Sequence, residues 1–333
     1  MIWIDKEKIF SEIRKRNPKT VVLNAPEGLM MRVQELALKV QELFDVQTIT
    51  IADPCYGVCD TVDEEVERLE ADIAFHIGHN ISLERIGKNT VLIDAIDDVD
   101  FDEVLRASLP TLKKYEIIGL CTISPYIHKI EKVESFLKGE GIEAIVGKGK
   151  GLVKDGQVLG CDFHTAFEIR EDVKAFVFLG QSIFHAIGIA LATNKPTFML
   201  DPYYKEVLDV TPMASDLSKK AMLSIYKALD ANTFGIIIGL KEGQRRLERA
   251  YTIKNELEKH GKKVLFIALH EVNNERLMQL QKIDAFVQTA CPRISINGES
   301  FHKPVLSTLQ AEALIKILDG KDFEDLFQRS TWV

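Results

Sequence analysis

The sequence predicts an α/β fold of parallel strands joined by crossover helices. Short apolar runs rich in Val and Ile alternate with longer segments of helical periodicity, which is typical of this class. The runs are continuous, as expected for strands that helices cover on both faces; they are 21–23, 74–77, 176–179 and 236–238. The covering helices are expected at 29–44, 127–138 and 243–260.

Three stretches resemble one another, which indicates an internal repeat. Each has a buried strand, a loop and a second short strand, at 71–94, 173–201 and 283–306. Upstream, 25–29 follows the strand 21–23 much as 240–244 follows 236–238. We therefore expect three homologous parallel-sheet units in pseudo-threefold arrangement around a central site, at 1–108, 109–205 and 206–333. Chance similarity among buried parallel strands is the alternative.

Charge and hydropathy exclude several classes of partner. Among 333 residues, Lys and Arg number 42 against 50 Asp and Glu, a formal charge of −8 without a dense basic block. This argues against nucleic-acid binding. No apolar run approaches the roughly 18 to 20 residues of a membrane span, and the first residues lack the layout of a secretory signal. We expect a cytoplasmic protein that binds neither membrane nor nucleic acid.

Cysteine carries the functional signal. An odd number of five in a reducing compartment makes a disulfide framework improbable. Cys59, Cys161 and Cys291 each follow an expected strand, one per unit, where open α/β sheets gather ligands. Three convergent thiolates without a fourth ligand suit a catalytic zinc or a [4Fe-4S] cluster that leaves one iron open.

The other two cysteines have simpler interpretations. Cys121 lies in an apolar run and is expected to be a small buried residue. Cys55 is expected to belong to the turn that directs Cys59, although it could instead replace Cys59 as a ligand. The usual radical S-adenosylmethionine spacing C-x3-C-x2-C is absent, because Val62 stands where its third cysteine would be.

The cysteine segments resemble a known family. They are Asp53-Pro54-Cys55-Tyr56-Gly57-Val58-Cys59-Asp60, Leu159-Gly160-Cys161 and Gln288-Thr289-Ala290-Cys291-Pro292-Arg293-Ile294-Ser295-Ile296. Together they resemble the three motifs of the archaeal enzymes for the first step of diphthamide biosynthesis, the 2-(3-amino-3-carboxypropyl)histidine synthases. The resemblance covers nearly the whole chain, and the middle motif, little more than Gly-Cys, is the weakest.

This resemblance implies a homodimeric, noncanonical radical enzyme. Cys59, Cys161 and Cys291 would hold a [4Fe-4S] cluster whose open iron binds S-adenosylmethionine. An electron from an unidentified donor, passed through the cluster, would break the bond to the methionine Cγ. The 3-amino-3-carboxypropyl radical would then add to the imidazole C2 of a histidine in translation elongation factor 2, and methylthioadenosine would leave.

The remaining strand-end loops are candidates for the S-adenosylmethionine pocket. The expected residues are Glu27, Gly28, Gly180, Gln181, Ser182, Gly239 and Arg293. Backbone N–H groups at 180–182, at a helix start, could hold the methionine carboxylate, and ordinary turn chemistry is the alternative. Arg293 could bind cluster sulfurs or a carboxylate. His79 and His164 are either neighbours of the cluster or structural hydrogen-bonding residues.

Two other functions fit the same pattern. Quinolinate synthase also resembles three α/β repeats that each give one cysteine to a [4Fe-4S] cluster, there for a dehydration. A non-catalytic multi-lobed protein could instead hold a small molecule between its lobes.

Overall fold

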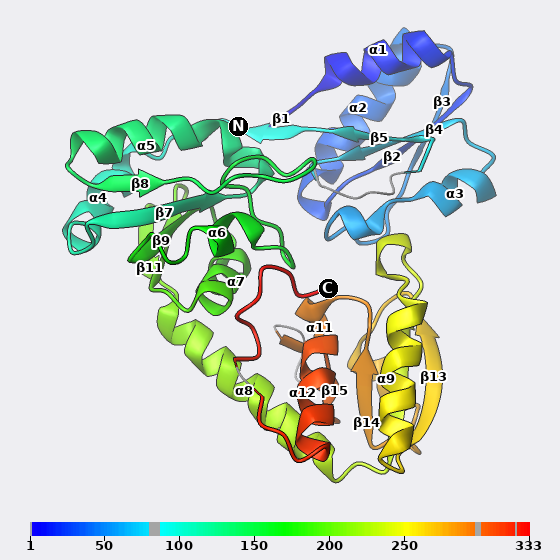
Figure 1. The fold of residues 1–333 in the computed structure, drawn as a ribbon. Coiled ribbons are helices and arrows are strands. Elements are labelled where there is room, and N and C mark those ends of the chain that lie inside the picture. The colour runs from blue at the N-terminus through cyan, green and yellow to red at the C-terminus, as the bar shows by residue number, and fades with distance from the viewer. Residues whose placement is uncertain (1, 80–86, 297–300, 324) are drawn as a thin grey trace.

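The computed structural model describes residues 2–79, 87–296, 301–323 and 325–333. Three sheets of mainly parallel strands, covered by helices, lie around a common centre (Figure 1). The α/β prediction is confirmed. A separate two-stranded ribbon pairs β1 (Ile2–Ile4) antiparallel with β6 (Ala95–Asp97). No helix in the described part of the chain is both long and apolar enough to cross a lipid bilayer.

The first sheet has the strand order β3-β2-β4-β5 and is parallel throughout. Its members are β2 (Thr20–Asn24), β3 (Gln47–Thr50), β4 (Ile73–Ile77) and β5 (Thr90–Ile93). Apolar stripes of α1 (Lys6–Arg16) and α2 (Met30–Leu43), which follows η1 (Glu27–Leu29), join one core with the strands. On the opposite face Val66 of α3 (Asp63–Arg68) packs in a smaller cluster.

The second sheet has the order β11-β10-β9-β7-β8, with only β11 antiparallel among its strands. They are β7 (Ile117–Thr122), β8 (Glu143–Ile145), β9 (Ala175–Leu179), β10 (Thr197–Asp201) and β11 (Glu206–Asp209). One core includes residues of α4 (Asp102–Leu112), η3 (Ser124–Lys129) and α5 (Ile130–Gly139). Residues of α6 (His164–Glu168) and α7 (Ile183–Thr193) belong to another.

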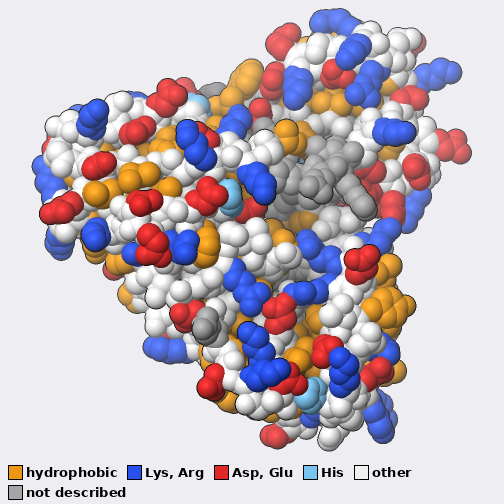
Figure 2. Space-filling model, in the orientation of Figure 1, with side chains coloured by type: hydrophobic (Ala, Val, Ile, Leu, Met, Phe, Trp, Pro, Cys, Tyr) orange, Lys and Arg blue, Asp and Glu red, His pale blue; other side chains and the backbone are white. Residues whose placement is uncertain are grey.

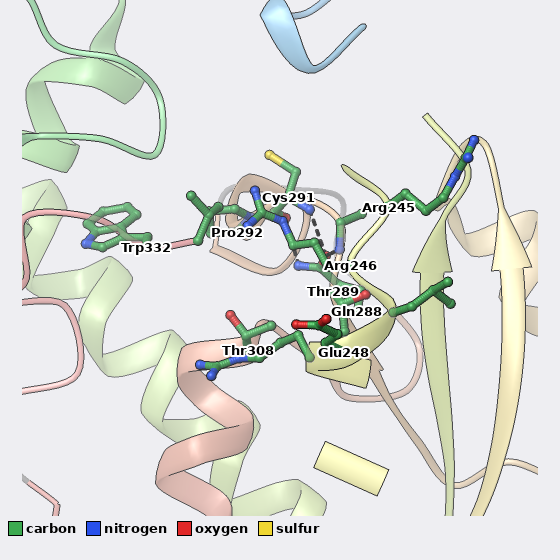
Figure 3. A pocket seen from close by; sticks show the side chains of 13 residues that line it. Arg245, Arg246, Glu248, Gln288, Thr289, Cys291, Pro292, Thr308 and Trp332 are labelled. Carbon is green, nitrogen blue, oxygen red and sulfur yellow. Dashed lines mark hydrogen bonds between the residues drawn. The ribbon is translucent and has the colours of Figure 1, made fainter. Parts of the chain in front are cut away.

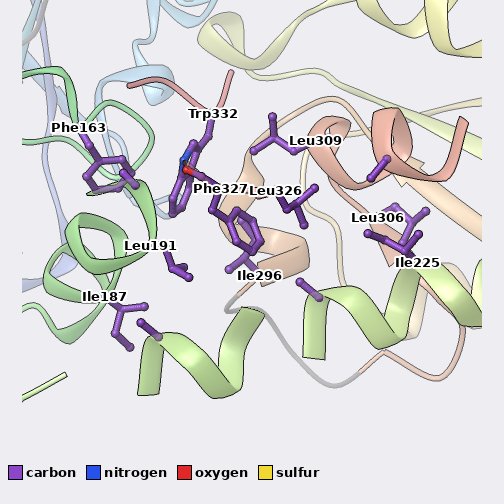
Figure 4. Close-up of a cluster of buried hydrophobic side chains, with 14 of the residues drawn as sticks. Phe163, Ile187, Leu191, Ile225, Ile296, Leu306, Leu309, Leu326, Phe327 and Trp332 are labelled. Atoms are coloured by element: carbon purple, nitrogen blue, oxygen red, sulfur yellow. Dashed lines mark hydrogen bonds between the residues drawn. The ribbon is translucent and has the colours of Figure 1, made fainter. Parts of the chain in front are cut away.

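The third sheet has the order β13-β12-β14-β15 and is parallel. Its members are β12 (Thr233–Gly239), β13 (Lys263–Leu269), β14 (Ala285–Gln288) and β15 (Val305–Leu306). Its helices are η4 (Glu242–Gln244), α9 (Leu247–Lys259), α10 (Asn274–Met278), α11 (Pro292–Ile296) and α12 (Thr308–Leu318). The long helix α8 (Thr211–Leu229) packs against both α7 and α12. The second and third sheets therefore share one hydrophobic core (Figure 4).

The three sheets repeat one strand order. Apart from β11, each runs second, first, third and fourth strand in order of sequence. The three expected strand pairs are β4 with β5, β9 with β10 and β14 with β15, all parallel. The unit boundaries expected at 108–109 and 205–206 stay a prediction. In the structure α4 runs through 108–109, and β11, after 205, pairs with β10. We propose three units whose joints lie near residues 100 and 210.

Candidate metal centre

The structure brings three cysteines together at the strand ends. Cys59 lies on η2 (Val58–Asp60) after β3, Cys161 in the loop after β8, and Cys291 between β14 and α11. Burial raises the pKa of Cys59 to about 12, and Asp60 and Cys291 add to the shift. Burial, Cys291 and Cys59 likewise raise the pKa of Cys161. Each thiol is thus close enough to another to oppose its ionisation.

This donor set fits an iron–sulfur cluster. Three partly buried thiols that repel each other as thiolates need a compensating positive centre, and iron supplies one. The guanidinium of Arg293 lies beside them: burial lowers its pKa, whereas Cys291, Cys161 and Cys59 raise it. Arg293 also stacks on the Phe184 ring, 3.7 Å from its centroid. The binding role expected for Arg293 stays a prediction.

Asp60 shapes the turn that carries Cys59. Its Oδ2 accepts hydrogen bonds from the backbone N–H groups of Tyr56 (2.8 Å) and Gly57 (3.0 Å). Its Oδ1 forms an ion pair of 2.8 Å with Lys241 of the third unit, which also pairs with Glu271 at 2.6 Å. Burial opposes the charge on Lys241, but these two carboxylates hold its pKa above the usual range. The Cys59 loop is therefore fixed from two sheets.

Gln288 fixes the turn at Cys291 in the same manner. This side chain is 1% exposed, and its Oε1 accepts from the backbone N–H groups of Ala290 and Cys291, both at 3.0 Å. Its Nε2 donates to the Cys291 carbonyl at 2.7 Å and to Ser295 Oγ at 3.0 Å. All four hydrogen bonds lie within 288–295, so the last residue of β14 orients the cysteine that follows it.

A cavity of about 610 Å³ opens beside Cys291 (Figure 3). Its wall carries Arg245, Arg246 and Arg249, together with Trp332. Arg245 and Arg249 form ion pairs with Glu64 and Glu312 respectively. The Arg246 Nε is buried and has no hydrogen-bond partner among the described residues. The Arg246 Nε–H is therefore available to donate a hydrogen bond to an anionic group in this cavity.

The residues expected at S-adenosylmethionine lie in several strand-end loops. Glu27 and Gly28 belong to η1, and Gly180, Gln181 and Ser182 precede α7. The Ser182 Oγ lies 2.6 Å from His185 Nδ1. Gly239 ends β12, where a Cβ would come within 2.9 Å of both Ala290 and Gln244. Close packing is sufficient to explain that glycine, and the role of the whole set stays a prediction.

A second group with potential metal ligands lies nearby. Suitable atoms of Cys55, His76 and His79 fall within 4.8 Å of one another. The Asn24 amide, however, donates to the Asp60 carbonyl (2.7 Å) and faces His76 Nδ1 (3.1 Å). His76 Nε2 then carries the proton and donates to His79 Nδ1 (3.2 Å), which occupies the lone pair that a metal would use.

The Cys55 thiol donates to the Gly57 carbonyl at 3.8 Å, and its Sγ lies 3.9 Å from His79 Nδ1. Cys59 is the cysteine of this loop whose pKa is affected by Cys291, so it remains our choice of ligand. Cys121 lies within β7 and is fully buried. His164 lies 3.2 Å from Glu168 on α6, in a structural contact.

Sequence reasoning missed Gln244 and Arg246. Gln244 Nε2 donates to Cys59 Sγ at 3.5 Å, although the two residues are 185 positions apart in the chain. The sequence does contain a pattern that could have identified them. Both residues directly follow the strand-end loop 239–243, and Arg245-Arg246 is a basic pair just before α9.

Comparison with known proteins places this chain in a family. The model of the family described as "Putative diphthamide synthesis protein" matches residues 25–324. The chain belongs to this family of diphthamide synthesis proteins.

Sequence relatives and a solved structure are similar to this chain over most of its length. The 2-(3-amino-3-carboxypropyl)histidine synthase of Pyrococcus horikoshii is 31% identical over 97% of this chain and 93% of its own. Subunit 1 of the Saccharomyces cerevisiae synthase is 28% identical over 91% of this chain and 72% of its own. The crystal structure of Dph2 from Pyrococcus horikoshii with a 4Fe-4S cluster covers 98% of this chain and 95% of that one, with a TM-score of 0.86 and 31% identity.

Proposed function

We propose that this chain is a 2-(3-amino-3-carboxypropyl)histidine synthase. It would transfer the 3-amino-3-carboxypropyl group of S-adenosylmethionine to the imidazole C2 of a histidine in translation elongation factor 2. The observation that carries this proposal is the electrostatic interaction among Cys59, Cys161 and Cys291, which follow strands of three different sheets: Cys291 raises the pKa of Cys59, and Cys291 and Cys59 raise that of Cys161. Membership of the family and the named relatives support it.

Cys59, Cys161 and Cys291 would hold the [4Fe-4S] cluster. Bound there, the cluster would supply one electron for reductive cleavage of the S–Cγ bond. Arg293 offsets the negative charge of the three thiolates, and the Gln244 amide donates to the Cys59 sulfur. Such contacts to ligand sulfurs are the protein's means of tuning a cluster.

The cavity beside Cys291 is our candidate for S-adenosylmethionine. Its volume of about 610 Å³ lies within the range of small-molecule sites. Arg246 offers a donor to the methionine carboxylate, and Gly180 to Ser182 remain the alternative. Because electron transfer to the sulfonium does not itself select a bond, orientation by such contacts must select Cγ.

The partners follow from the same proposal. Elongation factor 2 is the protein substrate, an external reductant supplies the electron, and the enzyme acts in the cytoplasm as a homodimer. Acidic and basic side chains are interspersed on the face shown in Figure 2, so this face has no dense basic patch of the kind that binds nucleic acid. For the dimer we propose the free edge of β13, where Leu265 and Phe266 are exposed.

The decisive experiment is anaerobic turnover. Protein with reconstituted cluster, dithionite, S-adenosylmethionine and elongation factor 2 should release methylthioadenosine and yield a factor heavier by one 3-amino-3-carboxypropyl group. Mass spectrometry of the histidine peptide measures the product. Cluster-loaded protein that releases no methylthioadenosine under these conditions would reject the proposal and favour a quinolinate-synthase-like dehydratase or a binding protein.

A further inference from the structure

The segment 325–333, which follows α12, returns to the second unit (Figure 1). It reaches the loop between β8 and α6, which carries Cys161. Thr331 and Asp162 form an antiparallel bridge. The Phe163 N–H donates to the Ser330 carbonyl at 2.7 Å, and the Trp332 N–H donates to the Cys161 carbonyl at 2.9 Å. The segment therefore pairs, backbone to backbone, with the cysteine itself.

Trp332 anchors this pairing. It is 1% exposed, and its ring centroid lies 4.7 Å from that of Phe163 and 5.3 Å from that of Phe327. Its Nε1–H donates to the Phe327 carbonyl at 3.0 Å. The three rings lie within the core shared by the second and third units (Figure 4). A buried indole with a satisfied N–H is a rigid anchor.

The other two cysteines are positioned differently. Asp60 closes the turn at Cys59 and Gln288 the turn at Cys291, each with hydrogen bonds to nearby backbone. The Cys161 loop crosses 146–163 without a helix or named strand. Its contacts with 330–332 come from residues about 170 positions away along the chain.

We propose that the segment 325–333 is a strap that positions Cys161 at the metal centre, with Trp332 as its positioning residue. The inference rests on the proposed function, because it assumes that Cys161 is a cluster ligand. Trp332 also lines the cavity beside Cys291. The strap thus contributes both to the second ligand and to the wall of the substrate pocket.

The test compares Trp332→Ala and Trp332→Phe with a matched control. The chain has only two tryptophans. The other one, Trp3 in β1, is 50% exposed, so Trp3→Ala is the matched control. Iron and sulfide are measured after anaerobic reconstitution. Alkylation rates of single cysteines are measured by mass spectrometry on folded, cluster-free protein.

Trp332→Ala should retain at least fivefold less iron and alkylate Cys161 at least tenfold faster. The alkylation rates of Cys59 and Cys291 should stay within twofold of their rates in the unaltered protein. Trp332→Phe should restore most of the iron, and Trp3→Ala should change neither quantity. Unaltered iron content and an unaltered Cys161 rate in Trp332→Ala would overturn the strap.

Two further outcomes keep the strap and the proposed function distinguishable. If the unaltered protein binds no iron, the proposed function fails, while the alkylation rates still test the strap. If Trp332→Ala does not fold, hydrogen exchange of the unaltered cluster-free protein replaces it. The amides of Phe163 and Trp332 should then exchange at similar rates, and free exchange at 330–333 beside a protected 159–163 would overturn the strap.

Discussion

The backbone of Gly243 lies directly against that of Cys59. A Cβ added to Gly243 would come within 2.4 Å of the Cys59 Cα and 2.7 Å of its Cβ. Both distances are shorter than any stable contact, so only glycine fits here. Through this approach η4 of the third unit brings Gln244 to the Cys59 sulfur. The contact of the first and third units is thus part of the metal centre.

Gly243→Ala should therefore separate these units and weaken cluster retention. Overpacking of this kind costs about 1–3 kcal/mol, which urea unfolding would measure, and iron content should fall by more than half. Gly139→Ala is the control, because a Cβ at Gly139 meets nothing within 4 Å. A Gly243→Ala protein with full iron content would show that the close approach is not needed.

Single replacements of the cysteines separate ligands from buried thiols. Cys59→Ala, Cys161→Ala and Cys291→Ala should each abolish cluster retention, because one missing thiolate leaves a second iron unprotected. Cys121→Ala should retain the cluster and lose only about 1 kcal/mol of stability for the small cavity. Visible absorbance and iron analysis under nitrogen give the measurement. Retention in Cys59→Ala with loss in Cys55→Ala would mean that Cys55 is the ligand.

The three repeated pairs of strands were predictable from sequence because they depend on local patterns. Buried parallel strands are continuous apolar runs, and β4, β9 and β14 all have them. The location of Cys59, Cys161 and Cys291 followed from the rule that ligands gather at carboxyl strand ends. These inferences needed no knowledge of how the units pack.

Contacts between units were not predictable in that manner. Gln244 reaches Cys59, and Trp332 reaches Cys161, only because separate units pack together. Nothing near Trp332 in the sequence distinguishes a strap from an ordinary chain end. The pairing of β11 with β10 as an antiparallel edge strand was also not predictable, because the short sequence of β11 carries no pattern that indicates its partner.

Arg246 is predicted to bind the carboxylate of S-adenosylmethionine. Arg246→Leu should raise the KM for S-adenosylmethionine at least tenfold, because a charge-assisted hydrogen bond contributes about 1.5–3 kcal/mol. Arg249→Gln is the matched control, since Arg249 lines the same cavity but pairs with Glu312. Steady-state release of methylthioadenosine supplies KM and kcat. An equal rise of KM in both variants would contradict this prediction and indicate that the positive charge of the cavity as a whole, not a hydrogen bond from Arg246, affects binding of S-adenosylmethionine.

The β13 edge provides a test of the dimer. Leu265 is 52% exposed on a seven-residue strand with one unpaired edge, and two such edges can pair about a twofold axis. Leu265→Lys should shift the protein from dimer to monomer at micromolar concentration in sedimentation velocity. Leu38→Lys, at a 69% exposed position on α2, should leave the dimer intact. A Leu265→Lys protein that stays dimeric would place the interface elsewhere.

Glu242 should make stability depend on pH. It accepts hydrogen bonds from the Glu64 N–H and the Thr61 hydroxyl across the same contact of units. Burial raises its pKa to about 7, with Asp63 adding to the shift, against an ordinary value of 4.5. The folded state therefore holds a proton that the unfolded state has released between pH 4.5 and 7, so this carboxyl destabilises the fold as pH rises through that window.

Glu242→Gln removes the ionisation. Its amide oxygen keeps the hydrogen bond from the Glu64 N–H, which Glu242 accepts on Oε1, and its amide N–H group takes the place of Oε2 beside the Thr61 hydroxyl, which can accept from it. Its gain in unfolding free energy over the unaltered protein should be smallest near pH 5, grow up to about pH 7 and be constant above pH 8. Urea titrations at each pH measure the difference. A difference that is the same at pH 5 and pH 8 would show that Glu242 ionises normally, and then the contact between η2 and η4 is more hydrated than its burial indicates.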